Sequence, residues 1–148
     1  MFALFDYSLY ETDNIVKVKL NNKIENNNDF SNFLNSWLTL YKNKQNFTFI
    51  FDTSNVGYIP IKYSIQMSLF IKKLKKQKTQ YLQKSIIYVN NNIVKRMLDF
   101  IFILQPPVAP VYIVTEMSYI ELILTNNTNK IDDEIIKILP SKSFLNIL

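Results

Sequence analysis

The stretch that most constrains the fold runs from Phe47 to Lys78. It opens with Phe47–Phe51 (FTFIF), an apolar run that is too short and too aromatic to favour a helix and that predicts a buried strand between two other strands. The polar cluster Asp52–Asn55 then indicates a turn. Pro60 suits the start of a helix, and the inner face of that helix repeats at spacings of three and four at Met67, Phe70, Ile71 and Leu74. In open α/β sheets the loop between such a strand and helix meets ligands and partners, so we expect the functional site there.

The rest of the chain alternates between strand and helix patterns. The other predicted strands are Ala3–Tyr10, Ile15–Leu20, Ser85–Val89 and Val111–Val114, the first two forming a hairpin. Helices are predicted after the capping run Asn26–Asp29, after Pro60, from Asn90–Asn92 to Gln105, over Tyr119–Leu124 and, briefly, over Glu134–Leu139. The inner faces of two helices are predicted to be Phe30, Phe33, Leu34, Trp37, Leu38 and Tyr41 in the first, and Ile93, Val94, Met97, Leu98, Ile101 and Phe102 in the third.

This alternation predicts an α/β fold with a four- to five-stranded, mostly parallel sheet, an N-terminal β-hairpin and about four helices. A chain of 148 residues is expected to form one domain. We place its core at about residues 14–124 and a linker and tail at 125–148.

The composition excludes several kinds of chemistry. The chain has no histidine and no cysteine, so zinc sites, cysteine–histidine pairs and serine–histidine triads are excluded. A single glycine, Gly57, is too few for a phosphate-binding or dinucleotide-binding loop. Asp132–Glu134 is interpreted as charge at a helix start rather than as a metal site. Asp52 could serve in catalysis or magnesium binding, but capping its own turn is the favoured interpretation. We therefore expect no enzymatic activity, no cofactor and no metal.

Charge and hydropathy bear on localisation and on secondary contacts. No apolar run reaches the roughly 18 residues that a spanning helix needs, and Met1–Glu11 lacks the basic flank and cleavage site of a secretory signal. We therefore expect a cytoplasmic protein. Much of the net charge of +5 comes from a lysine cluster that could meet anionic membrane or nucleic acid, although a solvated helix end is favoured. These lysines are Lys72, Lys73, Lys75, Lys76 and Lys78.

Three segments in this order resemble the STAS domain, the family of the bacterial anti-sigma-factor antagonists and of the cytoplasmic tails of anion transporters. Leu20–Glu25 resembles the segment that leaves the second strand of the family, with Asn22 replacing a glycine and Lys23 an acid. Phe49–Ile59 resembles the central strand and its loop, and Asn91–Phe100 (NNIVKRMLDF) is the closest local match. The resemblance spans about Asn14 to Leu124. It implies a regulatory module that binds a partner protein.

One departure from the family concerns its phosphorylation switch. Antagonists carry Asp-Ser-Ser-Gly where this chain has Pro60–Tyr63, and the regulatory serine falls on Lys62. A lysine cannot accept phosphate, so the resemblance implies a partner contact without that switch. The predicted contact residues are Tyr58, Ile59, Pro60, Ile61, Lys62, Tyr63, Asn90 and Asn91.

The alternative function is a carrier of a small molecule or lipid, because the related CRAL-TRIO fold shares the strand–helix alternation. That fold usually needs a longer chain and an extra helical gate. A closed apolar cavity would favour the carrier, whereas a solid core and an exposed apolar loop would favour the interaction module.

Overall fold

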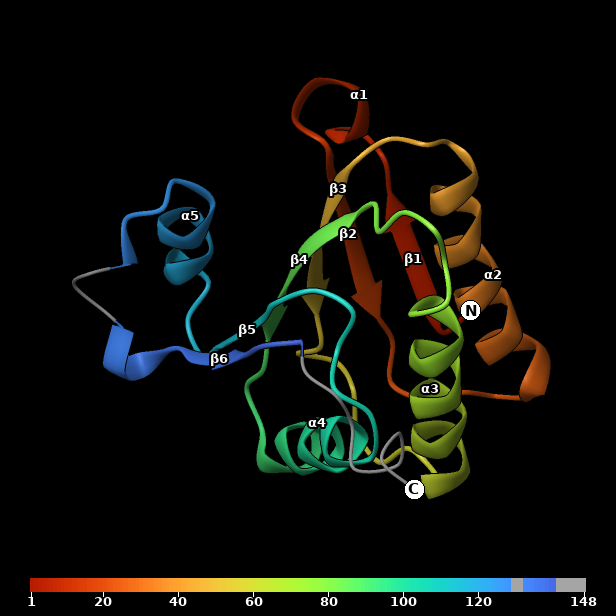
Figure 1. The fold of residues 1–148 in the computed structure, drawn as a ribbon. Helices are drawn as coiled ribbons and strands as arrows, with labels where there is room; N and C mark the ends of the chain where they lie inside the picture. Colours follow the sequence, from red (N-terminus) through yellow and green to blue (C-terminus); the bar gives the residue numbers. More distant parts are fainter. Residues whose placement is uncertain (129–131, 141–148) are drawn as a thin grey trace.

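The computed structural model describes residues 1–128 and 132–140 as an α/β fold built on one mixed sheet (Figure 1). Within those residues the sheet has six strands in the order β1-β2-β3-β4-β5-β6. The strands are β1 (Ala3–Asp6), β2 (Ile15–Leu20), β3 (Phe47–Asp52), β4 (Leu82–Tyr88), β5 (Val111–Val114) and β6 (Ile136–Ile138). The helices are α1 (Tyr10–Asp13), α2 (Asn27–Lys42), α3 (Ile61–Leu74), α4 (Asn92–Leu104) and α5 (Ser118–Leu124).

The strand directions follow from the connections. β1 and β2 are antiparallel, the pairs from β2 to β5 are parallel, and β6 returns antiparallel to β5. Each parallel crossover is one helix that leads to the next strand along the sheet. Since such crossovers are right-handed, α2, α3 and α4 all lie on one face (Figure 1). The predicted α/β class, the hairpin and the central position of β3 are confirmed.

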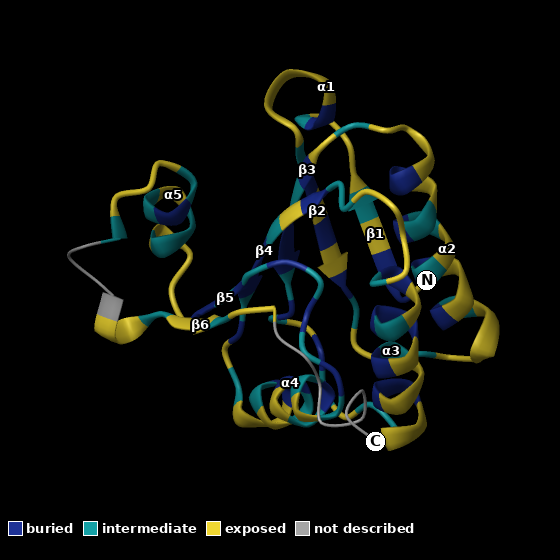
Figure 2. Cartoon of the chain, viewed as in Figure 1, coloured by how far each residue is buried: buried dark blue, intermediate teal, exposed yellow. Residues whose placement is uncertain are grey.

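The main core fills the space between that face and the three helices. Alternate residues of β3 point into it, and Phe49 is fully buried. Its ring meets the Trp37 ring of α2 edge-on, with 4.8 Å between the ring centroids. Figure 2 shows the buried positions on the sides of α2 and α3 that face the sheet. A smaller apolar cluster lies on the opposite face, where Ile123 of α5 packs with Ile50 and Val114.

Two asparagine caps define where helices begin. Asn26 Oδ1 accepts a hydrogen bond from the Asp29 N–H at 3.0 Å, and Asn91 Oδ1 accepts one from the Val94 N–H at 2.9 Å. Each bond satisfies a backbone donor that the first helical turn leaves unpaired. Both predicted capping runs are thus confirmed at these helix starts.

The structure corrects three local predictions. The first strand ends at Asp6 rather than Tyr10, because Asp6 Oδ1 accepts the Ser8 N–H at 2.9 Å and turns the chain into α1. The helix predicted over Glu134–Leu139 is wrong: Ile136–Ile138 is β6, which brings the number of strands to six rather than four to five. Ile93, predicted to face inward, has 56% of its side chain exposed because it lies in the first turn of α4, on the side away from Val94.

The sheet therefore extends beyond the predicted core of residues 14–124 and includes part of the predicted tail. Asp132–Glu134 forms a 3-10 turn just before β6. Residues 129–131 and 141–148 of that tail lie outside the described residues.

Candidate functional site

Three loops meet where the parallel strands end. Gly57, in the loop between β3 and α3, donates its N–H to the Asn22 carbonyl oxygen at 3.3 Å. Asn91, in the turn between β4 and α4, donates from Nδ2 to the Val56 carbonyl oxygen at 3.4 Å. The structure therefore joins the two segments predicted from the sequence, Tyr58–Tyr63 and Asn90–Asn91, into one surface. We call the surface of these loops the carboxyl-edge surface, comprising Asn21–Glu25, Thr53–Lys62 and Asn90–Ile93.

Hydrogen bonds at its start fix the loop between β3 and α3. Thr53 Oγ1 donates a hydrogen bond to the Tyr88 carbonyl oxygen at 2.6 Å, which fastens the loop to β4. Asp52 Oδ1 accepts the Ser54 N–H at 2.9 Å, as the turn-capping interpretation of this carboxylate requires. A Cβ at Gly57 would stand 3.2 Å from Asn22 Oδ1, so the absence of a side chain permits the close approach of the two loops.

The predicted contact residues differ in exposure. Tyr58 and Ile61 leave 74% and 60% of their surface in water, whereas Ile59 and Pro60 are half-buried. Lys62 and Asn90 are exposed, and Asn91 is half-buried.

Tyr63 is a core residue, with only 4% of its surface exposed. Its hydroxyl donates to Asn27 Oδ1 at 3.1 Å, and its ring packs on Phe30 with 5.1 Å between centroids. Tyr63 therefore supports the surface from below rather than contacting a partner.

An apolar row along α3 was not predicted. Ile65 and Leu69 follow Ile61 at intervals of four, and their exposed fractions are 44% and 60%. Residues four apart lie on one face of a helix, so the three side chains form a continuous row in water. The same spacing is present in the sequence, but the inner face of the helix is more strongly apolar and gives the clearer pattern there.

The lysine cluster lies at the other end of α3. Lys72 and Lys73 are in its last turn, and Lys75, Lys76 and Lys78 follow it. A helix of 14 residues is about 21 Å long, so the cluster is well separated from the loop at Tyr58. Burial lowers the pKa of Lys75.

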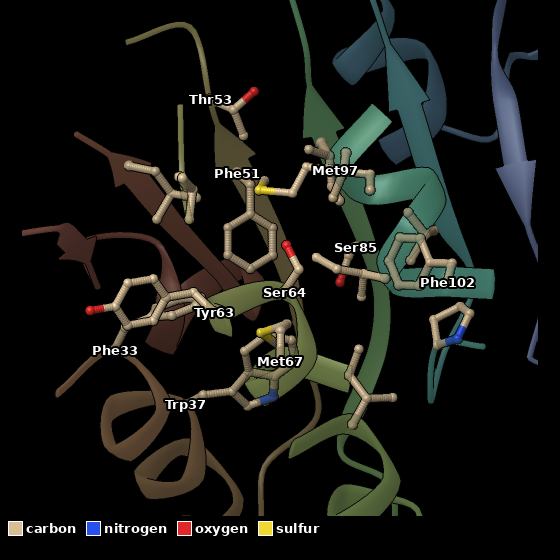
Figure 3. A pocket seen from close by; sticks show the side chains of 18 of the residues that line it. Phe33, Trp37, Phe51, Thr53, Tyr63, Ser64, Met67, Ser85, Met97 and Phe102 are labelled. Carbon is tan, nitrogen blue, oxygen red and sulfur yellow. The ribbon is translucent and has the colours of Figure 1, made fainter. Parts of the chain in front are cut away.

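An apolar cavity of about 110 Å³ lies beneath the carboxyl-edge surface, between the sheet and the helices (Figure 3). Ile24, Ile59 and Tyr63 line it from the loops and the start of α3. The other lining residues include Trp37, Phe51, Ser64, Met67, Ser85 and Phe102. The core is therefore not completely packed, but its cavity is too small to enclose a long hydrocarbon chain.

Within the described ranges, 1–128 and 132–140, no three carboxylate, histidine or cysteine side chains lie close enough to share a metal ion. In the same ranges, none of the helices is both long and apolar enough to cross a bilayer. Comparisons of the chain with protein-family models, with curated proteins and with solved structures find no match.

Proposed function

We propose that the chain is a non-catalytic, STAS-like interaction module that binds a partner protein through the carboxyl-edge surface. The observation that carries the proposal is the exposure of Tyr58 and Ile61 on a loop that hydrogen bonds tie to the neighbouring loops. Large apolar groups held in water at a fixed position are typical of interface anchors. Ile65 and Leu69 extend the apolar surface along α3.

The charges around this surface indicate the chemistry of the partner. α3 contains no aspartate or glutamate, while Lys62 lies next to Ile61 and Lys73 lies beyond Leu69. Opposite charges across an interface steer association and set its orientation. The proposed partner therefore presents apolar side chains with an acidic rim.

The fold supports the STAS-like part of the proposal. An N-terminal hairpin, a largely parallel sheet and three crossover helices on one face agree with the strand–helix order on which the resemblance rests. Lys62, in place of the family's regulated serine, is exposed beside Ile61. In this proposal the partner contact is constitutive, because no phosphate can be added at that position.

Two further observations support an interaction module over the other functions considered. Asp52, the carboxylate at the end of β3, already accepts the Ser54 N–H in its own turn. The cavity of about 110 Å³ is smaller than the engineered cavity of about 150 Å³ that holds a single benzene, so a lipid chain would not fit.

The test is co-purification of the partner from the native cell, followed by titration with two variants. Ile61→Asp is expected to weaken binding at least tenfold, because it places a carboxylate at an apolar anchor. Gln66→Glu is the control, since it adds the same charge on the same helix at an exposed position outside the apolar row. Both variants are expected to keep the melting temperature of the wild type.

Two results would contradict the proposal. Normal binding by Ile61→Asp would remove the loop from the interface. An equal loss of affinity with Gln66→Glu would show that added negative charge anywhere on α3 weakens binding. The loss of an apolar anchor would then not be the cause.

A further inference from the structure

The cavity beneath the carboxyl-edge surface is a space that the side chains around it leave unfilled. Protein interiors are normally packed as densely as organic crystals, and a void of this size lowers the stability of the fold. Its lining within the described residues contains aromatic and aliphatic side chains and no charged one. A charged ligand would lose its hydration without gaining an ion-pair partner, so the lining selects a neutral, largely apolar molecule.

Four hydroxyl side chains line the cavity, Thr53, Tyr63, Ser64 and Ser85, and the first two have the hydrogen-bond partners described above. Ser64 on α3 and Ser85 on β4 are both buried, and Figure 3 shows them near the centre of the cavity, between Phe51 and Phe102. Within the described part of the chain, neither hydroxyl has a hydrogen-bond partner. Buried polar groups are nearly always hydrogen-bonded, so these two hydroxyls are available to bond with a molecule that enters the cavity.

Ser68 provides an internal comparison. It lies one helical turn after Ser64 and is equally buried, but its Oγ donates to the Ser64 carbonyl oxygen at 3.0 Å and lies 3.3 Å from the Ile101 carbonyl oxygen of α4. The hydroxyl of Ser68 is thus explained by helix packing, whereas the hydroxyls of Ser64 and Ser85 are not.

We propose that this cavity is a binding site for a small neutral molecule, no larger than benzene, that carries one hydroxyl or carbonyl oxygen. The apolar part fills the void between the sheet and α3, and the oxygen bonds with the hydroxyls of Ser64 and Ser85. The volume of about 110 Å³ sets the upper limit on size, because a cavity of about 150 Å³ holds one benzene. This site lies beneath the proposed partner surface and shares Ile24 and Ile59 with it, but its test does not depend on the partner.

We place the entry path for this molecule between α3 and α4. Met67 and Met97 line the cavity and are only half-buried, as is Phe102. Methionine side chains are unbranched and change conformation readily, so they admit a ligand without unfolding the helices.

The chain contains one tryptophan, and Trp37 lines the cavity, so its fluorescence reports binding directly. The probes are cyclopentanol, cyclopentane and butyrate, which share a small size and differ in polarity and charge. For the wild type we expect saturable binding of cyclopentanol, weaker binding of cyclopentane and no binding of butyrate.

Four variants separate a ligand site from a packing defect. Ser64→Ala and Ser85→Ala are each expected to weaken cyclopentanol binding about fivefold, the usual worth of one neutral hydrogen bond, and to leave cyclopentane binding unchanged. Ser68→Ala is the matched control and is expected to bind like the wild type. Ala109→Leu fills the cavity from its lining and is expected to abolish binding of both neutral probes.

The inference is overturned if neither neutral probe gives a saturable change, or if Ala109→Leu, once shown to be folded, binds like the wild type. Equal cyclopentanol affinities of Ser64→Ala, Ser85→Ala and Ser68→Ala would also overturn it, since the two hydroxyls would then have no role. The serine variants keep the test decisive should Ala109→Leu fail to fold.

Discussion

Replacing Phe49 by alanine is expected to cost the fold about 4 to 5 kcal/mol. Phe49 lies at the centre of β3 with none of its surface exposed. Its ring centroid lies 4.7 Å from that of Phe51, 4.8 Å from that of Trp37 and 5.1 Å from that of Phe47. Phenylalanine-to-alanine changes in cores cost about 3 to 5 kcal/mol, and the loss of these close aromatic contacts, each worth about 0.5 to 1.5 kcal/mol, favours the upper part of that range.

A chain of this length has a total stability of about 7 to 22 kcal/mol, at about 0.05 to 0.15 kcal/mol per residue. Phe49→Ala therefore removes a large fraction of it, and Phe49→Asp, which buries an unpaired carboxylate, is expected to abolish folding. The assay is urea unfolding followed by circular dichroism. Tyr58→Ala is the control, because its largely exposed side chain contributes less than about 0.5 kcal/mol. A loss below about 1 kcal/mol for Phe49→Ala, or a soluble Phe49→Asp that melts cooperatively, would refute the assignment of β3 as the core strand.

Four other outcomes are expected. Asn91→Ala removes the cap of α4 and should cost about 1 kcal/mol in urea unfolding. Burial raises the pKa of Tyr41 to about 12, against about 10 in the unfolded chain, so stability should fall as the pH rises from about 10 towards 12, and less so in Tyr41→Phe. Assays for hydrolase, transferase and redox activity should show no turnover above background. A turnover that Asp52→Asn abolishes would contradict this. Binding to anionic vesicles should be weak, with each lysine near the surface contributing about 1 kcal/mol, and it should decrease as salt is added. It should disappear when glutamine replaces the lysine cluster of Lys72, Lys73, Lys75, Lys76 and Lys78.

Local patterns predicted the helices better than the ends of the strands. The core-facing row of α2 repeats with helical period and begins at a capping asparagine, Asn26, so both signals act within a few residues. β6 has no such local signal. Its three residues, Ile136–Ile138, fit a helix or a strand equally well, and only pairing with the edge of β5 decides between them. The exposed position of Ile93 likewise depends on how α4 is rotated against the sheet.

Only part of the candidate site could be predicted from the sequence, for similar reasons. The junction after β3 was recognised from the order of strand, turn and helix, and Tyr58 and Ile61 are exposed there. Tyr63 is buried because it lies four and seven residues before Met67 and Phe70, on the inner face of α3. The cavity could not be predicted, because an unfilled volume depends on how side chains from seven helices and strands fit together, and no short segment records that.

The strand order also bears on how the chain folds as it is made. Every hydrogen-bonded pair in the sheet joins strands that are successive in the sequence, from β1–β2 to β5–β6. Each new strand therefore finds its partner already in place, at the growing edge of the sheet, as soon as its own helix has emerged from the ribosome. Among the described strands, no pairing therefore has to close a loop that spans another strand of the sheet. The sheet can thus be assembled in the direction of synthesis, with no early strand left waiting for a partner encoded far downstream.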